Sequence, residues 1–247
     1  MSIEHMSIEQ KTTAHEMEEI AGNIASVEKQ ICQLTEEYQR PKNSVRLLAV
    51  SKTKPVSALE AAYHAGQRAF GENYVQEAVE KRQTLSHLAD IEWHFIGPIQ
   101  SNKSRMIAEN MDWVHSIDRE KIARRLSEQR PESLPPLKVC IQVNISGEAS
   151  KAGVSLSELD NMVALVNSLP NLCLKGLMAI PAPQDSHDAQ CAVYRPLADA
   201  FNALSAKQTE VDTLSIGMSG DLPAAIASGS TMVRVGTAIF GARDYSV

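Results

Sequence analysis

The stretch Arg46-Leu47-Leu48-Ala49-Val50-Ser51-Lys52-Thr53-Lys54-Pro55 decides the fold. It begins as an apolar run of strand length and ends at a proline, and a helical pattern follows it. Such a run predicts a strand buried on both faces, as in a parallel sheet covered by helices. Lys52 then lies at the carboxyl end of the strand, where α/β folds place their functional groups. A partly desolvated amine there has a lowered pKa and can form a Schiff base; the alternative is a lysine that only reaches solvent.

The rest of the chain repeats this strand-then-helix order. A leading amphipathic helix is expected at about residues 7–40, with its apolar face formed by Ile20, Ile24, Val27, Ile31 and Leu34. Further strands are expected at 67–73, 92–97, 113–118, 137–145, 172–180, 213–216 and 232–235. Eight strands alternating with helices in 247 residues predict an α/β fold, a single (β/α)8 TIM-type barrel at about 45–241 within one domain, 1–247. A doubly wound open sheet is the alternative, because alternation does not fix the strand count.

Composition and charge exclude several classes of protein. The net charge is −6, from 24 basic and 30 acidic residues, with no basic face, which argues against nucleic-acid binding. No apolar run approaches the roughly 20 residues of a membrane span, and the N-terminus lacks the pattern of a secretory signal. The cysteines are scattered and predict neither a metal site nor disulfides: Cys32, Cys140, Cys173 and Cys191. We therefore expect a cytoplasmic protein.

Two glycine-containing loops near the C-terminus predict a phosphate site. In the segment 214–226, Gly217 and Gly220 allow a tight turn with exposed N–H groups, and Ser219 adds a hydroxyl. A plain strand–helix connection has a similar composition, so this loop alone leaves both readings open. Gly236 and Thr237 end the eighth strand, and loops after strands seven and eight are a recurrent phosphate site in such barrels.

Other polar residues near strand ends have two interpretations each. Arg234 lies between apolar neighbours, so it needs either an internal carboxylate or a ligand group near the barrel mouth. Asn73 either lines a ligand at the mouth or forms a turn. Lys54 shares the strand parity of Lys52, but the following proline indicates a loop. Lys151 either is solvated or reaches the mouth as a second amine.

Three internal polar residues complete the candidates. His94 and His115 lie inside predicted strands, which favours core or supporting roles over catalysis. Glu72 is a conceivable base, although nothing in its spacing indicates one.

Seven segments together resemble one known family, that of the pyridoxal phosphate homeostasis proteins, also described as alanine racemase N-terminal-domain-like proteins. They cover nearly the whole chain: Ala49-Val50-Ser51-Lys52-Thr53-Lys54-Pro55, Phe70-Gly71-Glu72-Asn73-Tyr74-Val75-Gln76-Glu77, Trp93-His94-Phe95-Ile96-Gly97, Gln100-Ser101-Asn102-Lys103, Leu174-Lys175-Gly176-Leu177-Met178, Ser215-Ile216-Gly217-Met218-Ser219 and Val233-Arg234-Val235-Gly236-Thr237-Ala238-Ile239-Phe240-Gly241.

The resemblance implies a barrel of pyridoxal phosphate (PLP) fold type III with the cofactor held as an internal aldimine on Lys52. It also implies that Arg234 faces the pyridine nitrogen and that the phosphate is contacted by Ser219, Gly220, Gly236 and Thr237. An arginine disfavours protonation of that nitrogen, because two like charges would meet, and the ring becomes a weaker electron sink. The family's role is control of the free cofactor, without an established catalytic reaction.

We therefore expect a non-catalytic protein that holds PLP and releases or exchanges it. An amino-acid racemase is the main alternative, but racemases with this barrel add a β-domain, and this sequence ends at Val247, just after the eighth strand. A Schiff-base aldolase without the cofactor would need neither the two phosphate loops nor Arg234. The expected partners are PLP, related B6 vitamers and PLP-dependent apo-enzymes, and the expected state is a monomer or weak dimer. The sequence leaves open whether Lys54 or Lys151 forms a second PLP site, and whether Met1 or Met6 is the natural start.

Overall fold

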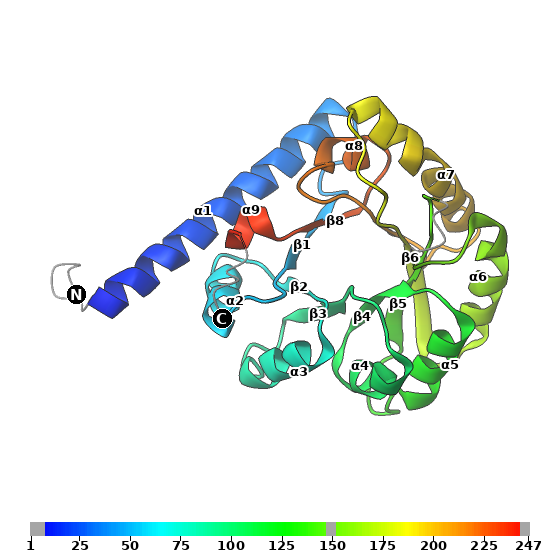
Figure 1. Cartoon of the computed structure of the whole chain (residues 1–247), viewed down its shortest axis with the longest axis horizontal. Helices are drawn as coiled ribbons and strands as arrows, with labels where there is room; N and C mark the ends of the chain where they lie inside the picture. The colour runs from blue at the N-terminus through cyan, green and yellow to red at the C-terminus, as the bar shows by residue number, and fades with distance from the viewer. Residues whose placement is uncertain (1–7, 147–151, 243–247) are drawn as a thin grey trace.

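The structure, a computed structural model, describes residues 8–146 and 152–242. Eight strands alternate with helices along the chain (Figure 1). The strands are β1 (Arg46–Val50), β2 (Ala69–Glu72), β3 (Glu92–Phe95), β4 (Trp113–Ile117), β5 (Leu137–Gln142), β6 (Leu172–Met178), β7 (Thr213–Ser215) and β8 (Met232–Val235). The helices are α1 (Ile8–Glu37), α2 (Val56–His64), α3 (Val75–Thr84), α4 (Ser104–Asn110), α5 (Glu120–Gln129), α6 (Leu159–Ser168), α7 (His187–Ser205), α8 (Leu222–Ala227) and α9 (Thr237–Phe240), with short 3-10 turns at η2 (Ser101–Lys103) and η3 (Leu156–Glu158).

The sheet is a closed barrel in which every strand is parallel to its neighbours. The order is β1 to β8 in sequence, and β8 returns to pair with β1, with Leu48 opposite Arg234 and Ala49 opposite Val235. This closure confirms the predicted (β/α)8 barrel and excludes the open doubly wound sheet. The carboxyl ends of all eight strands therefore meet at one mouth, the usual functional face of this architecture.

The residues of β1 alternate between the two sides of the barrel wall. Leu48 clusters with Ala69 and Met232, whereas the next residue, Ala49, joins the larger core formed with the surrounding helices. A further interior cluster contains Trp113, Cys140 and Met178. Both faces of the wall are thus buried, which explains why β1 reads as a continuous apolar run.

The leading helix α1 lies against the seam where the barrel closes, beside α2, α8 and α9 (Figure 1). The five apolar residues predicted for its inner face are all buried. Asn23 donates from Nδ2 to the carbonyl of Ile239 at 3.0 Å. Beyond the helix, Arg40 donates to the carbonyls of Ile226, at 3.1 Å, and Ser230. α1 is therefore attached to the last two helices of the chain as well as to its neighbour α2.

The predicted boundaries differ from the structure mainly at strand ends. The second to seventh strands each end before their predicted limit, because the terminal residues turn into the loops around the mouth. The four-residue helix α9 had no prediction, since it is too short to show a helical period. Among the described helices, none is both long and apolar enough to cross a membrane.

Candidate functional site

Lys52 lies in a tight turn directly after β1, and its side chain is half-buried. The turn begins where Ser51 N–H donates to the carbonyl of Gly71 at 3.0 Å, which extends the β1–β2 pairing by one residue. Lys54 N–H then donates back to the carbonyl of Ser51 at 3.1 Å. Between them Thr53 has φ of 64°, a left-handed conformation that is costly for a β-branched residue. This strained turn needs support from outside itself.

A buried ion-pair network, which we call the charged cradle, gives that support; it consists of Glu72, Glu77 and Lys81. Lys81 Nζ donates to Glu72 Oε1 at 2.8 Å, to Glu77 Oε1 at 2.6 Å and to the carbonyl of Ser51 at 2.7 Å. Ser51 Oγ donates to Glu72 Oε1 at 2.6 Å, and Thr53 N–H donates to Glu77 Oε1 at 2.5 Å. The residues on both sides of Lys52 are thus bonded to the cradle.

Two of the three cradle side chains are almost completely buried, with exposures of 5% for Lys81 and 0% for Glu72, whereas Glu77 is 24% exposed. Burial raises the pKa of the Glu72 carboxyl, and the opposing effects of the Lys81 charge and the hydrogen bonds from Lys81 and Ser51 favour the ionised form. Glu72, which the sequence left as a conceivable base, has its Oε1 atom committed to structural bonds. Glu72 therefore helps to hold the Lys52 turn in place through Ser51 and Lys81.

The first predicted phosphate loop follows β7. Gly217 has φ of 96°, and a Cβ there would lie 2.5 Å from the Cβ of Ala225, so only glycine fits. Asp221 closes the loop, because its Oδ1 accepts from Met218 N–H at 2.6 Å. Ser219 and Gly220 are exposed at the tip, and their N–H groups donate to no acceptor within the described ranges. The loop thus presents unused donors to the outside.

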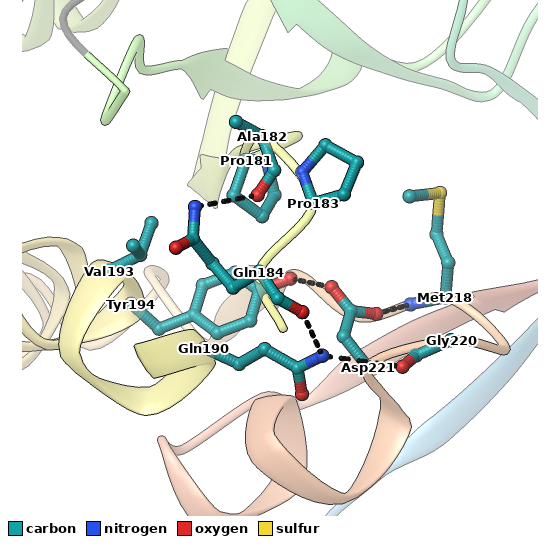
Figure 2. Close-up of a pocket in the computed structure, with 10 residues that line it drawn as sticks. All are labelled: Pro181, Ala182, Pro183, Gln184, Gln190, Val193, Tyr194, Met218, Gly220 and Asp221. Carbon is teal, nitrogen blue, oxygen red and sulfur yellow. Dashed lines mark hydrogen bonds between the residues drawn. The ribbon is translucent and has the colours of Figure 1, made fainter. Parts of the chain in front are cut away.

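A pocket of about 200 Å³ lies between this loop and α7 (Figure 2). Its hydrogen bonds join the two sides: Tyr194 OH donates to Asp221 Oδ2 at 2.6 Å, and Gln190 Nε2 reaches the carbonyl of Gly220 at 3.5 Å. Burial, and then the neighbouring Asp221 charge, raise the pKa of Tyr194, which therefore remains a hydrogen-bond donor. Tyr194 and Asp221 together fix the loop that carries Ser219 and Gly220.

The second predicted phosphate loop follows β8 and passes directly against β1. A Cβ on Gly236 would lie 3.0 Å from the carbonyl oxygen of Val50, so glycine permits the close approach. Thr237 is exposed at the start of α9, and neither its N–H nor its hydroxyl has a recorded partner in the described part of the chain. The two loops are neighbours, since Arg234 N–H donates to the carbonyl of Gly217 at 2.9 Å.

Lys54 supports the second loop from the other end of α9. Its Nζ donates to the carbonyls of Phe240 at 2.7 Å and Ala242 at 2.8 Å, where an ammonium satisfies the last groups of a helix. This contact assigns Lys54 a structural partner in the described structure. Lys151, the other candidate second amine, lies outside the described residues.

Arg234 is 4% exposed and lies at the carboxyl ends of β6 and β7. Its Nη1 donates to the carbonyl and the Oγ of Ser215 at 2.5 and 2.8 Å, and its Nη2 donates to the carbonyl of Ala179 at 2.9 Å. Among the described residues it makes no ion pair, so the internal carboxylate considered from the sequence is wrong. Burial lowers its pKa. Its Nε and one Nη2 hydrogen have no acceptor in the described part, which leaves them for a ligand.

Asn73 follows β2 at the mouth. Its backbone packs against Gly97, where a Cβ would lie 2.4 Å from the Asn73 carbonyl oxygen. Its Oδ1 is buried and has no hydrogen-bond partner within the described ranges. A buried amide oxygen without a partner is costly in a closed structure, so this atom also fits a ligand contact better than a turn.

The barrel thus brings most predicted site residues to one sector of the mouth, on β7, β8, β1 and β2. The sequence analysis missed the residues that hold this sector in shape: Lys81, Tyr194 and Asp221. Glu77 and Lys81 are spaced i, i+4 on one helix, a visible pairing signal, but burial of that pair depends on tertiary structure.

Sequence comparisons place the chain among known proteins. The family model for the alanine racemase N-terminal domain matches residues 23–244. The pyridoxal phosphate homeostasis protein of Escherichia coli (strain K12) is 56% identical over 232 residues, which are 93% of this chain and 99% of that protein. The protein of the same name from Vibrio alginolyticus is 58% identical over 233 residues, 93% of this chain and 100% of that one.

Solved structures of similar proteins have the same fold as this chain. PipY from Synechococcus elongatus, solved without PLP, has a TM-score of 0.80 and 37% identity over 90% of this chain and 100% of PipY. PipY with PLP bound has a TM-score of 0.77 with the same identity and coverage. Alanine racemase from Corynebacterium glutamicum shares the fold, with a TM-score of 0.64 and 19% sequence identity. The match covers 93% of this chain and 62% of the racemase.

Proposed function

This chain belongs to the pyridoxal phosphate homeostasis proteins of the alanine racemase N-terminal domain family, and on that premise we propose that it binds PLP as part of intracellular PLP homeostasis. The observation that carries the proposal is the juxtaposition of the Lys52 turn with two loops that have unused donors, at the β8–β1 seam. Relatives named for this role, and PipY with PLP bound, support it.

The residues present fit the cofactor by their unsatisfied groups. A phosphate dianion needs several donors, and the tips of the two loops offer N–H groups and hydroxyls from Ser219, Gly220 and Thr237. A pyridine nitrogen accepts one hydrogen bond, and Arg234 has buried donors to spare. The Oδ1 of Asn73, which has no hydrogen-bond partner in the described part of the chain, borders the same mouth. The net negative charge of the cofactor also compensates the buried Arg234 guanidinium, which has no ion pair among the described residues.

The bound cofactor supplies an aldehyde for attachment, an anionic phosphate and a ring nitrogen. Lys52 would hold the cofactor covalently through its deprotonated amine, and the cofactor's aldehyde would supply the carbon for this linkage, with loss of one water. Ser219, Gly220, Gly236 and Thr237 would hold the phosphate, Arg234 would donate to the ring nitrogen, and Asn73 would border the ring. Since this linkage is reversible, water restores the free amine and the protein can release or exchange the cofactor.

We further propose that the protein does not turn over amino acids appreciably. Racemisation needs a second base opposite the lysine, usually a tyrosine. Tyr194 is committed to Asp221, and Tyr74, 50% exposed after β2, has no base-like partner among the described residues. The test is to incubate the PLP-loaded protein with L-alanine and other L-amino acids and to assay D-enantiomers and keto acids. Turnover on the order of 1 per second, abolished by Lys52→Ala, would favour a racemase or transaminase instead.

PLP attachment is tested by absorbance and reduction. The purified protein with PLP is expected to be yellow, borohydride is expected to remove the band, and peptide mass analysis is expected to find the pyridoxyl group on Lys52. Lys121→Ala, a change of an exposed lysine on α5, is the matched control and leaves the band intact. Label found on Lys54 or Lys151 in the unaltered protein would refute the assignment.

The phosphate loops are tested separately. Ser219→Ala with Thr237→Ala is expected to weaken PLP retention by roughly 1.5–3 kcal/mol per lost charge-assisted contact, with little change in thermal stability because both side chains are exposed. Unchanged affinity in the double variant would move the phosphate elsewhere.

A further inference from the structure

A second buried polar network runs through the barrel interior beneath Arg234. It consists of His94, His115 and Ser215, which we call the histidine column. His94 Nδ1 and His115 Nε2 are 2.9 Å apart, and His115 Nδ1 and Ser215 Oγ are 2.9 Å apart. Arg234 Nη1 donates to the same Oγ at 2.8 Å. The three column residues are completely buried.

The column crosses the barrel. His115 is on β4 and Ser215 is on β7, and two strands separate them in the closed order, so their hydrogen bond passes through the interior. At the other end His94 Nε2 lies 3.7 Å from Glu92 Oε2, at the first residue of β3. Glu92 in turn pairs with Arg46, at the start of β1, at 2.6 Å. Because 3.7 Å is beyond hydrogen-bond distance and His94 Nε2 has no hydrogen-bond partner within the described ranges, the hydrogen-bonded column ends at His94, and the Glu92 carboxylate lies beyond it toward the amino-terminal end of the barrel.

One direction of the hydrogen bonds satisfies the buried groups of the column best. Arginine donates and never accepts, so Ser215 Oγ is an acceptor for Arg234. Within the described structure the one acceptor for the Ser215 hydroxyl hydrogen is His115 Nδ1, so an unprotonated Nδ1 gives that buried hydrogen a partner, whereas a protonated Nδ1 would leave it without one. His115 therefore carries its hydrogen on Nε2 and donates to His94 Nδ1, and His94 carries its hydrogen on Nε2, toward Glu92.

This direction gives the column an electrostatic effect. Every hydrogen points away from the guanidinium and toward the carboxylate, so the two neutral imidazoles align their dipoles between a positive and a negative group. The His94 ring is also stacked on Trp113, with centroids 5.1 Å apart and 13° between planes. Burial lowers the pKa of both histidines, which keeps them neutral. Arg234, which has no ion pair in the described part, is stabilised through this chain and by carbonyl oxygens.

We propose that His94, His115 and Ser215 are positioning residues for Arg234: the column fixes one edge of the guanidinium, so that its remaining donors meet the ring nitrogen of the bound cofactor. This inference rests on the proposed function, because it assigns the free donors of Arg234 to PLP. A plain polar core would satisfy the same groups but would have no effect on the bound ring.

The test combines two measurements. Nitrogen-15 NMR of the cofactor-free protein reads the tautomers directly, and both His94 and His115 are expected as Nε2–H imidazoles, with exposed His64 as an internal reference. In PLP titrations, Ser215→Ala is expected to weaken binding roughly tenfold, as loss of a supporting hydrogen bond does behind a metal ligand, and to shift the absorption maximum. Cys140→Ala, also in the barrel interior, is the packing control and leaves the maximum unchanged. Ser215→Cys, of nearly the same shape, guards against misfolding and gives an intermediate effect.

The outcomes separate the two proposals. An Nδ1–H tautomer at His115, or a Ser215→Ala variant that melts earlier yet binds PLP with wild-type affinity and absorption maximum, overturns the positioning role while the proposed function stands. Failure of the wild-type protein itself to bind PLP overturns the proposed function, and the positioning role with it.

Discussion

The charged cradle beside Lys52 and the histidine column beneath Arg234 are both buried and both bond to the surroundings of a proposed cofactor contact, but they are built differently. In the cradle Lys81 is paired directly with Glu72 and Glu77. In the column the buried cation has no carboxylate partner in the described chain, and neutral imidazoles separate it from Glu92. A network of paired charges is most sensitive to loss of a partner, whereas a network of neutral groups is most sensitive to an added proton.

The largest effect is expected when the cradle loses its cation. Lys81→Met leaves the fully buried Glu72 without its charge partner and the Ser51 carbonyl without its donor, so the free energy of unfolding is expected to fall by about 3–5 kcal/mol. Urea denaturation measures it. Lys121→Met, at an exposed position of α5, is the matched control and stays within about 0.5 kcal/mol of wild type.

A second variant sharpens this result. Adding Glu72→Leu to Lys81→Met removes the buried charge that was left behind, and part of the lost stability is expected to return. A loss below about 1 kcal/mol in Lys81→Met alone would mean that the cradle is not an important support of the turn.

An intermediate effect is expected when the column is protonated. Both histidines have folded-state pKa values below the unfolded value, and burial is the main cause. At His94, Glu92 and Asp112 oppose this lowering and Arg46 adds to it. At His115, Arg234 and Arg46 lower the pKa further. The unfolded chain therefore binds more protons below about pH 6.5, and stability is present above that pH and lost below it. The loss is expected to reach about 1.4 kcal/mol per pH unit for each histidine.

Unfolding free energies between pH 7.5 and 5.0 check this. The slope is expected to shrink in His115→Phe, which lacks one of the two groups, and to remain in His64→Gln, where the replaced ring is exposed. An identical slope in His115→Phe and wild type would show that the column does not resist protonation.

The smallest effect concerns the strained residue that the cradle holds. Thr53→Gly removes the penalty of φ = 64°, about 1–2 kcal/mol, but adds about 0.5–1 kcal/mol of chain entropy, so a net gain below about 1 kcal/mol is expected. Thermal denaturation measures it, with Thr84→Gly in α3 as a control that loses stability. A destabilised Thr53→Gly would mean that the threonine side chain itself supports the turn.

The strands and their order were predictable because each is a short apolar run between helical patterns, and β8 agrees with its predicted bounds. Alternation alone did not fix closure: chain length and the family resemblance predicted a barrel, and the pairing of β1 with β8 confirms it. The resemblance and the loop chemistry led to the site residues on β1, β7 and β8, and the structure brings these strands together. Their roles toward PLP remain proposals.

The residues behind the site were not predictable from the sequence. Lys81 lies in a polar helix, where a lysine is normally solvated, and only the packing of α3 on the barrel buries it. His115 and Ser215 are 100 residues apart, and no spacing rule connects them. The internal carboxylate predicted as one partner of Arg234 was wrong for a related reason. The guanidinium is bound instead by backbone carbonyl oxygens at strand ends, and a sequence cannot indicate them because every residue has one.

The seam between β1 and β8 has a consequence for biosynthesis. Lys52 follows the first strand and Thr237 follows the last, and α1 bonds across the same seam to α9, with 216 residues between Asn23 and Ile239. Chains emerge from the ribosome at roughly 5–20 residues per second. For about ten seconds or more, therefore, the nascent protein has its lysine but neither phosphate loop beside it. The site comes into existence with the closing strand, so retention of the cofactor would report a completed barrel.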